Sequence, residues 1–279
     1  MLAIGLALGA SAVWGVGDFL GGLKSRVLPL VVVLVCSQAV GFAAVGLVTL
    51  AAGRPAPPAH DAVLAALSAI AGTAGLAAFY CALAVGKMSV VVPISATSAG
   101  LPVVVGIASG DRPDALQLAG IALAVAGAVL AARERDTRDG GGRFAAGALL
   151  AAASALAFGL FFLAMDSAAD GGAIWASFVN RATSTTILLL VVLAVRPSFA
   201  GVRPHLPVLA AIGTFDVMAN VLFAAASTKG LISLVSVASS LYPVMTLVLA
   251  RTFLHERVHR VQELGIAAAL SGVVLIAAG

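Results

Sequence analysis

The sequence predicts an all-α integral membrane protein with ten transmembrane helices, arranged as two inverted repeats of five helices each. The composition, the length of the apolar runs and an internal repeat carry this prediction. Hydrophobic residues make up 61% of the 279 residues and charged residues 10%, and the mean hydropathy is +1.12. A soluble domain has roughly 25% charged residues, because its surface faces water. The composition therefore excludes a soluble globular fold.

The apolar runs are continuous, and each is about 20 residues long, the length that a helix needs to cross a hydrocarbon core of about 30 Å. They lack the polar–apolar alternation that is typical of strands in a transmembrane barrel. Short stretches with charges, glycine and proline separate them. The predicted spans are 2–21, 30–52, 62–84, 89–109, 115–132, 144–165, 173–195, 206–227, 231–250 and 263–279.

Polar residues and prolines recur in the same order in the two halves of the chain. Four residues around the start of the fifth span reappear 145 positions later: Asp111, Arg112, Gln117 and Gly120 match Glu256, Arg257, Gln262 and Gly265. Three residues of the fourth span reappear 141 positions later: Ser95, Ser98 and Pro102 match Ser236, Ser239 and Pro243. This repetition indicates a duplication. The predicted domains are a first five-helix repeat (1–132), a charged and glycine-rich linker loop (133–143) and a second five-helix repeat (144–279).

The number of helices in each half sets their relative orientation. Because five is odd, two successive five-helix halves enter the membrane in opposite senses. Such an inverted repeat places a substrate site between the halves near the middle of the bilayer, which is the geometry of a transporter.

Short motifs in both halves are similar to those of a known family. They are Trp14-Gly15 in the first span, the run SSLYPV at 239–244, and Glu256-Arg257 followed by Gln262 and Gly265. In this order and in duplicate, they resemble EamA-type members of the drug/metabolite transporter superfamily over nearly the whole chain. The resemblance implies a ten-helix secondary transporter that exports amino acids, other metabolites or drugs without ATP hydrolysis. The sequence has no GxxxxGK[ST] phosphate-binding loop.

The expected partners are a small-molecule substrate and the lipid bilayer, in a multi-pass protein of the cell membrane without a cofactor. Nucleic acid is not an expected partner despite the pI near 9.6, because basic residues in loops between spans face anionic lipid headgroups. The alternative is a membrane-embedded protein that does not transport, such as an intramembrane enzyme or a sensory or assembly partner. An enzyme is not expected, because the spans contain no paired aspartates or serine–histidine combination, and all four histidines, including the two of the HExxH run at 255–259, lie in loops or at span edges.

Arg181, in the seventh span, and Asp216, in the eighth, are the most informative charged residues. An arginine near the centre of a span costs about 2.5–3.5 kcal/mol, so Arg181 must face a cavity or a partner. It is interpreted either as an anchor for an anionic group of the substrate or as part of a structural ion pair. Burial disfavours the charged form of a carboxyl group, so Asp216 is either a carrier of a coupling proton or the charge partner of Arg181. The depths of the two residues differ by about four residues, roughly 6 Å, and we expect them to pair.

Uncharged polar residues extend this pattern. Asn220 lies four residues after Asp216, so both share one face of the eighth span. The fourth and ninth spans carry serines beside prolines, and the set predicts a cavity wall: Ser95, Ser98, Ser236 and Ser240. The alternative is that these small residues only allow helices to approach closely.

Four further residues complete the candidate site and its surroundings. Trp14 and Tyr80 are predicted at the edge of the cavity, whereas Asp18 is placed near a membrane face, as a cap or a snorkelling side chain. Gln38 matches Arg181 at an offset of 143 and gives the first half an uncharged polar group at that position. The predicted substrate-binding residues are Trp14, Tyr80, Ser95, Ser98, Arg181, Asp216, Asn220, Ser236 and Ser240. One negative and one positive charge among them would suit a zwitterion such as an amino acid.

The distribution of basic residues predicts the orientation in the membrane. Of the 15 Lys and Arg outside the predicted spans, 12 lie in the odd-numbered loops, and the positive-inside rule places such loops in the cytoplasm. Both termini would then be outside, whereas the family pattern places both termini in the cytoplasm. Single cysteines in the 133–143 loop should therefore resist a membrane-impermeant thiol reagent in intact cells. Ready labelling would reject the model with outside termini.

Overall fold

The computed structural model describes residues 1–25, 27–53, 55–85, 94–95, 97–131, 141–254 and 260–278. Within these residues the chain folds into helices and has no strand, which confirms the all-α class. The start of the predicted fourth span and residues 133–140 of the predicted linker lie outside the described residues.

Six of the described helices are long and apolar enough to cross a membrane, by their length and composition. They are α1 (Leu2–Ser25), α2 (Leu30–Ala52), α3 (Ala59–Val85), α7 (Gly141–Ala169), α8 (Ala173–Val195) and α9 (Leu206–Ser227). Large apolar side chains such as Leu50, Leu149 and Leu193 are exposed on their outer faces, as expected where lipid replaces water as the solvent. The chain is an integral multi-pass membrane protein.

The remaining helices are shorter. They are a 3-10 turn η1 (Thr97–Ala99), α5 (Gly100–Ser109), α6 (Ala115–Ala131), a 3-10 turn η2 (Arg203–His205), α10 (Ile232–Ser239), α11 (Tyr242–Leu254) and α12 (Arg260–Ala278). The predicted ninth span is thus two helices that meet at residues 240–241. Pro243 explains the break, because it lacks the N–H that would continue the hydrogen-bond ladder of α10. Proline is favoured in the first turn of the next helix instead.

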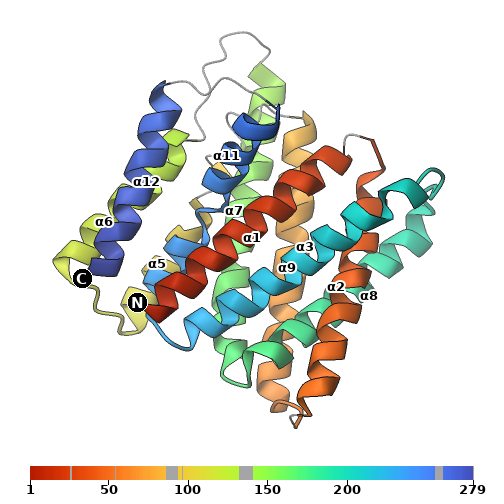
Figure 1. Cartoon of the computed structure of the whole chain (residues 1–279), viewed down its shortest axis with the longest axis horizontal. Helices are drawn as coiled ribbons and strands as arrows, with labels where there is room; N and C mark the ends of the chain where they lie inside the picture. The colour runs from red at the N-terminus through yellow and green to blue at the C-terminus, as the bar shows by residue number, and fades with distance from the viewer. Residues whose placement is uncertain are drawn as a thin grey trace.

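Helices that are distant in the sequence pack side by side (Figure 1). α1 packs along α9, α3 packs along α7, and α2 packs against both α8 and α9. α6 and α12 lie side by side at one end of the molecule, and α2 and α8 lie at the other end. The largest hydrophobic cluster joins α1, α7, α9 and α10 and includes the buried side chains of Met165, Phe223 and Val235.

Glycines bring α6 and α12 into contact through their backbones. A Cβ on Gly120 would lie 2.7 Å from the carbonyl oxygen of Gly272, and one on Gly127 would lie 2.7 Å from that of Gly265. Gly120, near the start of α6, meets Gly272, near the end of α12. Gly127, further along α6, meets Gly265, near the start of α12, so the two helices run antiparallel. Small residues permit this approach, and van der Waals contact then replaces the hydrophobic effect as the source of stability in lipid.

The α6–α12 contact predicts the effect of adding one methyl group. Gly127→Ala should lower the stability by about 1–3 kcal/mol, because the new Cβ meets the backbone of α12, which cannot move aside. Gly5→Ala is the matched control, since its Cβ would have no atom within 4 Å, and it should be neutral or stabilising. Thermal unfolding in detergent measures both variants. Equal melting temperatures would contradict the packing described here.

Candidate functional site

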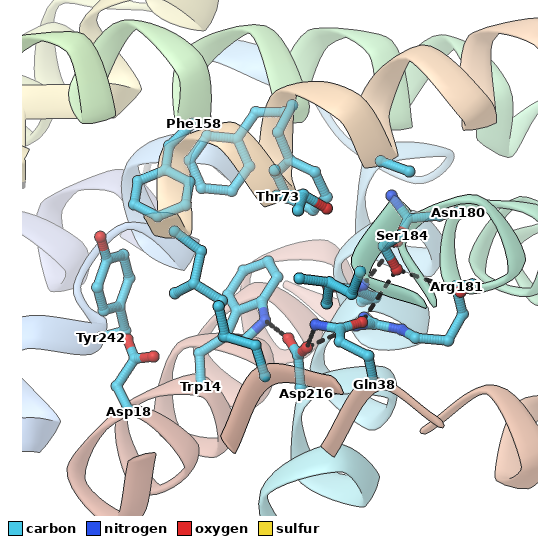
Figure 2. Close-up of a pocket in the computed structure, with 18 residues that line it drawn as sticks. Trp14, Asp18, Gln38, Thr73, Phe158, Asn180, Arg181, Ser184, Asp216 and Tyr242 are labelled. Carbon is cyan, nitrogen blue, oxygen red and sulfur yellow. Dashed lines mark hydrogen bonds and ion pairs between the residues drawn. The ribbon is translucent and has the colours of Figure 1, made fainter. Parts of the chain in front are cut away.

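A cavity of about 90 Å³ lies among α1, α2, α3, α7, α8, α9 and α11. Since one water needs about 10–15 Å³ by this measure, the cavity has room for several waters or a small organic group. Its apolar lining is largely aromatic and includes Trp14, Phe158, Phe161, Phe162 and Tyr242. Its polar wall contains Asp18, Gln38, Thr73, Asn180, Arg181, Ser184, Asp216 and Asn220. Figure 2 shows Phe158 across the cavity from the Arg181–Asp216 pair, with Trp14 beside Asp216.

An ion pair and its hydrogen bonds form the centre of the polar wall (Figure 2). The guanidinium of Arg181 lies 2.7 Å from Oδ2 of Asp216, so the predicted pairing of these two residues is confirmed. Arg181 also donates to Oε1 of Gln38, which accepts a second hydrogen bond from Ser184 at 3.0 Å. Nε2 of Gln38 donates to Oδ2 of Asp216 at 3.3 Å, and Nε1 of Trp14 donates to Oδ1 at 3.1 Å. Both carboxylate oxygens of Asp216 are therefore engaged.

Close contact between α2 and α9 positions this network. A Cβ on Gly41 would lie 2.8 Å from the carbonyl oxygen of Gly213, and a Cβ on Gly213 would collide with the carbonyl oxygen of Ser37. The hydroxyl of Thr185 donates to the carbonyl oxygen of Gln38 at 3.2 Å and ties α8 to α2 at the same level. Two glycines thus bring the backbones close enough for polar side chains from three helices to meet.

The surroundings determine what the ion pair contributes. The side chain of Arg181 is 3% exposed and that of Asp216 is 27% exposed, so the arginine is the deeper partner and the carboxylate borders the cavity. Removing one member of a buried pair costs about 3–5 kcal/mol, because the other charge is left uncompensated. Of the two interpretations of Asp216, this geometry supports the charge partner.

A second polar chain crosses the cavity wall. Nδ2 of Asn220 donates to Oδ1 of Asn180 at 3.4 Å, and Nδ2 of Asn180 donates to the hydroxyl of Ser68 at 2.8 Å. That hydroxyl donates in turn to the carbonyl oxygen of Ala65. The chain connects α9, α8 and α3. Asn220 therefore borders the cavity, as the sequence predicts, with its amide held by Asn180.

Trp14 lies deeper than predicted. Its ring centroid is 6.0 Å from those of Phe161, Phe162 and Phe223, and its N–H bonds the central carboxylate, so it belongs to the centre of the cavity and not to its edge. Tyr80 lines a smaller adjoining cavity that shares Trp14 and Asp216 with the first. Its hydroxyl lies 2.8 Å from the position of a Cβ on Gly21, so it closes the gap between α3 and α1.

The serines do not form the predicted wall in this structure. None of the four lines either of the two cavities described. Ser236 and Ser240 donate to the carbonyl oxygens of Ser233 and Val237, three residues earlier in the chain. Ser95 and Ser98 are buried, and their hydroxyls have no hydrogen-bond partner among the described residues. The alternative interpretation, that small residues allow close helix packing, fits these positions.

Gln38 and Asp18 are two of the cavity residues that were not among the predicted site residues. Gln38 is central to the network, and its match to Arg181 at an offset of 143 was the signal for it. Asp18 was placed near a membrane face because the first span was predicted to end at residue 21. α1 continues to Ser25, so Asp18 lies deeper and lines both cavities. Its position four residues after Trp14, on the same helical face, could have indicated this.

The ion pair predicts a pattern of loss and rescue. Asp216→Asn should lower stability by about 3–5 kcal/mol, because it leaves the guanidinium of Arg181 buried without its counter-charge. Arg181→Gln in the same chain should restore part of that loss. Asp114→Asn is a matched control, since this exposed side chain caps α6 and asparagine caps equally well. Chemical unfolding in detergent gives the coupling free energy, and additive losses in the double variant would contradict the pairing.

Comparisons with known proteins agree with the family resemblance. Residues 145–278 match the model of the EamA-like transporter family. A solved structure, titled as a crystal structure of a protein, is similar with a TM-score of 0.83 and 18% sequence identity, over 99% of this chain and 98% of that chain. At that identity, the likeness shows the fold. A search of curated proteins gives no match. The family match over residues 145–278 and the fold shared over the whole length both support an EamA-type transporter.

Proposed function

We propose that the chain is a secondary transporter that exports small polar or amphipathic metabolites, such as amino acids or drug-like compounds, across the cell membrane by alternating access. The observation that carries this proposal is the cavity at the junction of helices from both parts of the chain, which is lined by aromatic side chains and by a few polar ones around an ion pair. Ligand sites of this kind combine a large apolar lining with a few placed polar groups.

The packing supports a ten-span architecture with inverted repeats. Gly120 and Gly265 are equivalent in the repeat, and so are Gly127 and Gly272, at the same offset of 145. In the structure Gly120 meets Gly272, and Gly127 meets Gly265. Two equivalent helices that pack antiparallel are what two halves of opposite orientation produce. α7 and α9 are the first and third spans of the second half, as α1 and α3 are of the first half. In the pairs α1–α9 and α7–α3, the first span of each half therefore packs against the third span of the other half.

The cavity extends toward one side of the protein. The smaller cavity shares Trp14, Asp18 and Gln38 with the larger one and continues past Gly21 and Tyr80. It therefore leads toward the side of the protein that carries the loops after α1 and α8. The excess of basic residues predicts that side to be cytoplasmic. A cavity that continues toward the cytoplasm suits a transporter that takes its substrate from inside the cell. Coupling to a proton stays a prediction, tested by transport with and without a pH gradient.

The proposal is tested by filling the cavity. Thr73 lines it, so Thr73→Phe should reduce efflux at least about tenfold, because the added ring occupies the substrate's space. Thr186→Phe is the matched control, since Thr186 is exposed on the outer face of α8. Purified protein in liposomes loaded with the twenty amino acids and 2-phenylethylamine, with release followed by mass spectrometry, measures both variants.

Two outcomes would count against the proposal. Release of every compound at the rate of protein-free liposomes would argue against transport of these classes and favour a non-transporting membrane protein. Equal release by the native chain and Thr73→Phe would show that substrates do not pass through this cavity.

A further inference from the structure

The charges that line the cavity do not balance. Among the described residues they are one arginine, Arg181, and two aspartates, Asp18 and Asp216. The guanidinium of Arg181 is engaged by Asp216 and Gln38. No described cation is within salt-bridge distance of Asp18. The next basic residue along α1 is Lys24, and its ammonium lies 3.3 Å from Nδ1 of His205.

Asp18 has no structural task that would account for its position. It lies well inside α1, so it is not a helix cap. The side chain is partly buried and lines both cavities. A carboxylate in apolar surroundings is costly unless a counter-charge or hydrogen bonds compensate it. In a membrane-spanning segment such a residue marks a functional site by default.

The walls near Asp18 suit an organic cation. In Figure 2, Asp18 and Tyr242 lie at one end of the cavity, opposite Arg181, and Trp14 lies between. Aromatic faces attract ammonium groups, and Trp and Tyr do so more strongly than Phe. The side chain of Tyr242 is buried, and its hydroxyl has no hydrogen-bond partner among the described residues. A ligand with a polar group at this end of the cavity could supply that partner.

We propose that the cavity recognises substrates with a cationic nitrogen on an apolar body, with the ammonium bound at Asp18 and the apolar body against Trp14 and the phenylalanines. This inference rests on the proposed transport function and narrows its substrate class. A zwitterion fits less well than a cation, because Arg181 is already paired and no free positive charge faces the carboxylate of an amino acid.

The test is a series of phenyl compounds that differ mainly in charge: 2-phenylethylammonium, phenylalanine, 3-phenylpropionate and the neutral 3-phenylpropan-1-ol. The protein is the full chain in lipid nanodiscs with Trp175→Phe, so that fluorescence reports on Trp14 alone. We expect 2-phenylethylammonium to bind about tenfold to a hundredfold more tightly than the neutral alcohol, because a hydrogen bond to a charged group adds that much. The anion should bind most weakly.

Variants at Asp18 separate recognition from folding. Asp18→Asn should lose the preference for the cation, because the amide carries no charge to attract the ammonium, while 3-phenylpropan-1-ol still binds measurably through its apolar body. Asp18→Glu should retain the preference. Binding of the alcohol also shows that each variant is folded, and the native chain tests the charge preference without any change at Asp18.

The outcomes distinguish this inference from the proposed function. Equal binding of the cation and the alcohol by the native chain, or an unchanged preference in Asp18→Asn, would overturn cation recognition and leave transport of uncharged or zwitterionic compounds standing. Failure of all four compounds to bind would overturn the cation site. The efflux measurement on the twenty amino acids would then decide the proposed function separately.

Discussion

An arginine buried in the apolar interior is the constraint on which the rest of this structure depends. The side chain of Arg181 in α8 is 3% exposed, so the fold must supply a counter-charge and hydrogen-bond acceptors. Asp216 from α9 and Gln38 from α2 supply them. Three helices, one from the first half and two from the second, are thereby held at one level of the membrane. The cavity borders this level because Asp216 faces it.

Glycine makes that meeting of polar groups sterically feasible. Helices in lipid gain little from hiding apolar surface, so they associate through close packing and polar contacts. Gly41 and Gly213 let α2 and α9 touch beside the ion pair, and Gly15 lets α11 approach α1, where Thr246 donates to the carbonyl oxygen of Gly15 at 3.2 Å. The second contact places Tyr242 near Trp14 and Asp18. The positions of the glycines thus determine the shape of the cavity as much as the side chains that line it do.

The sequence predicted the features that depend on the length of an apolar run or on how far a residue lies from the end of its helix. The six long helices follow from apolar run length, and the Arg181–Asp216 pair follows from the similar distance of both residues from one loop. Asp18 was misplaced because helix ends are the weakest part of such a prediction, and four extra residues in α1 moved it from the surface to the cavity. The four predicted serines line neither of the two described cavities, for another reason. A hydroxyl can bond to its own helix, and the sequence does not show which neighbour occupies the space before it.

We propose that a transported compound binds in this cavity, which is bordered by the ion pair and by aromatic side chains. The most direct measurement is an experimental structure, by electron cryomicroscopy in nanodiscs, of the protein with a compound that it releases from liposomes. We expect density for that compound in contact with Trp14, with the Arg181–Asp216 pair still formed. Density at a lipid-facing seam, with side chains filling the cavity, would contradict it.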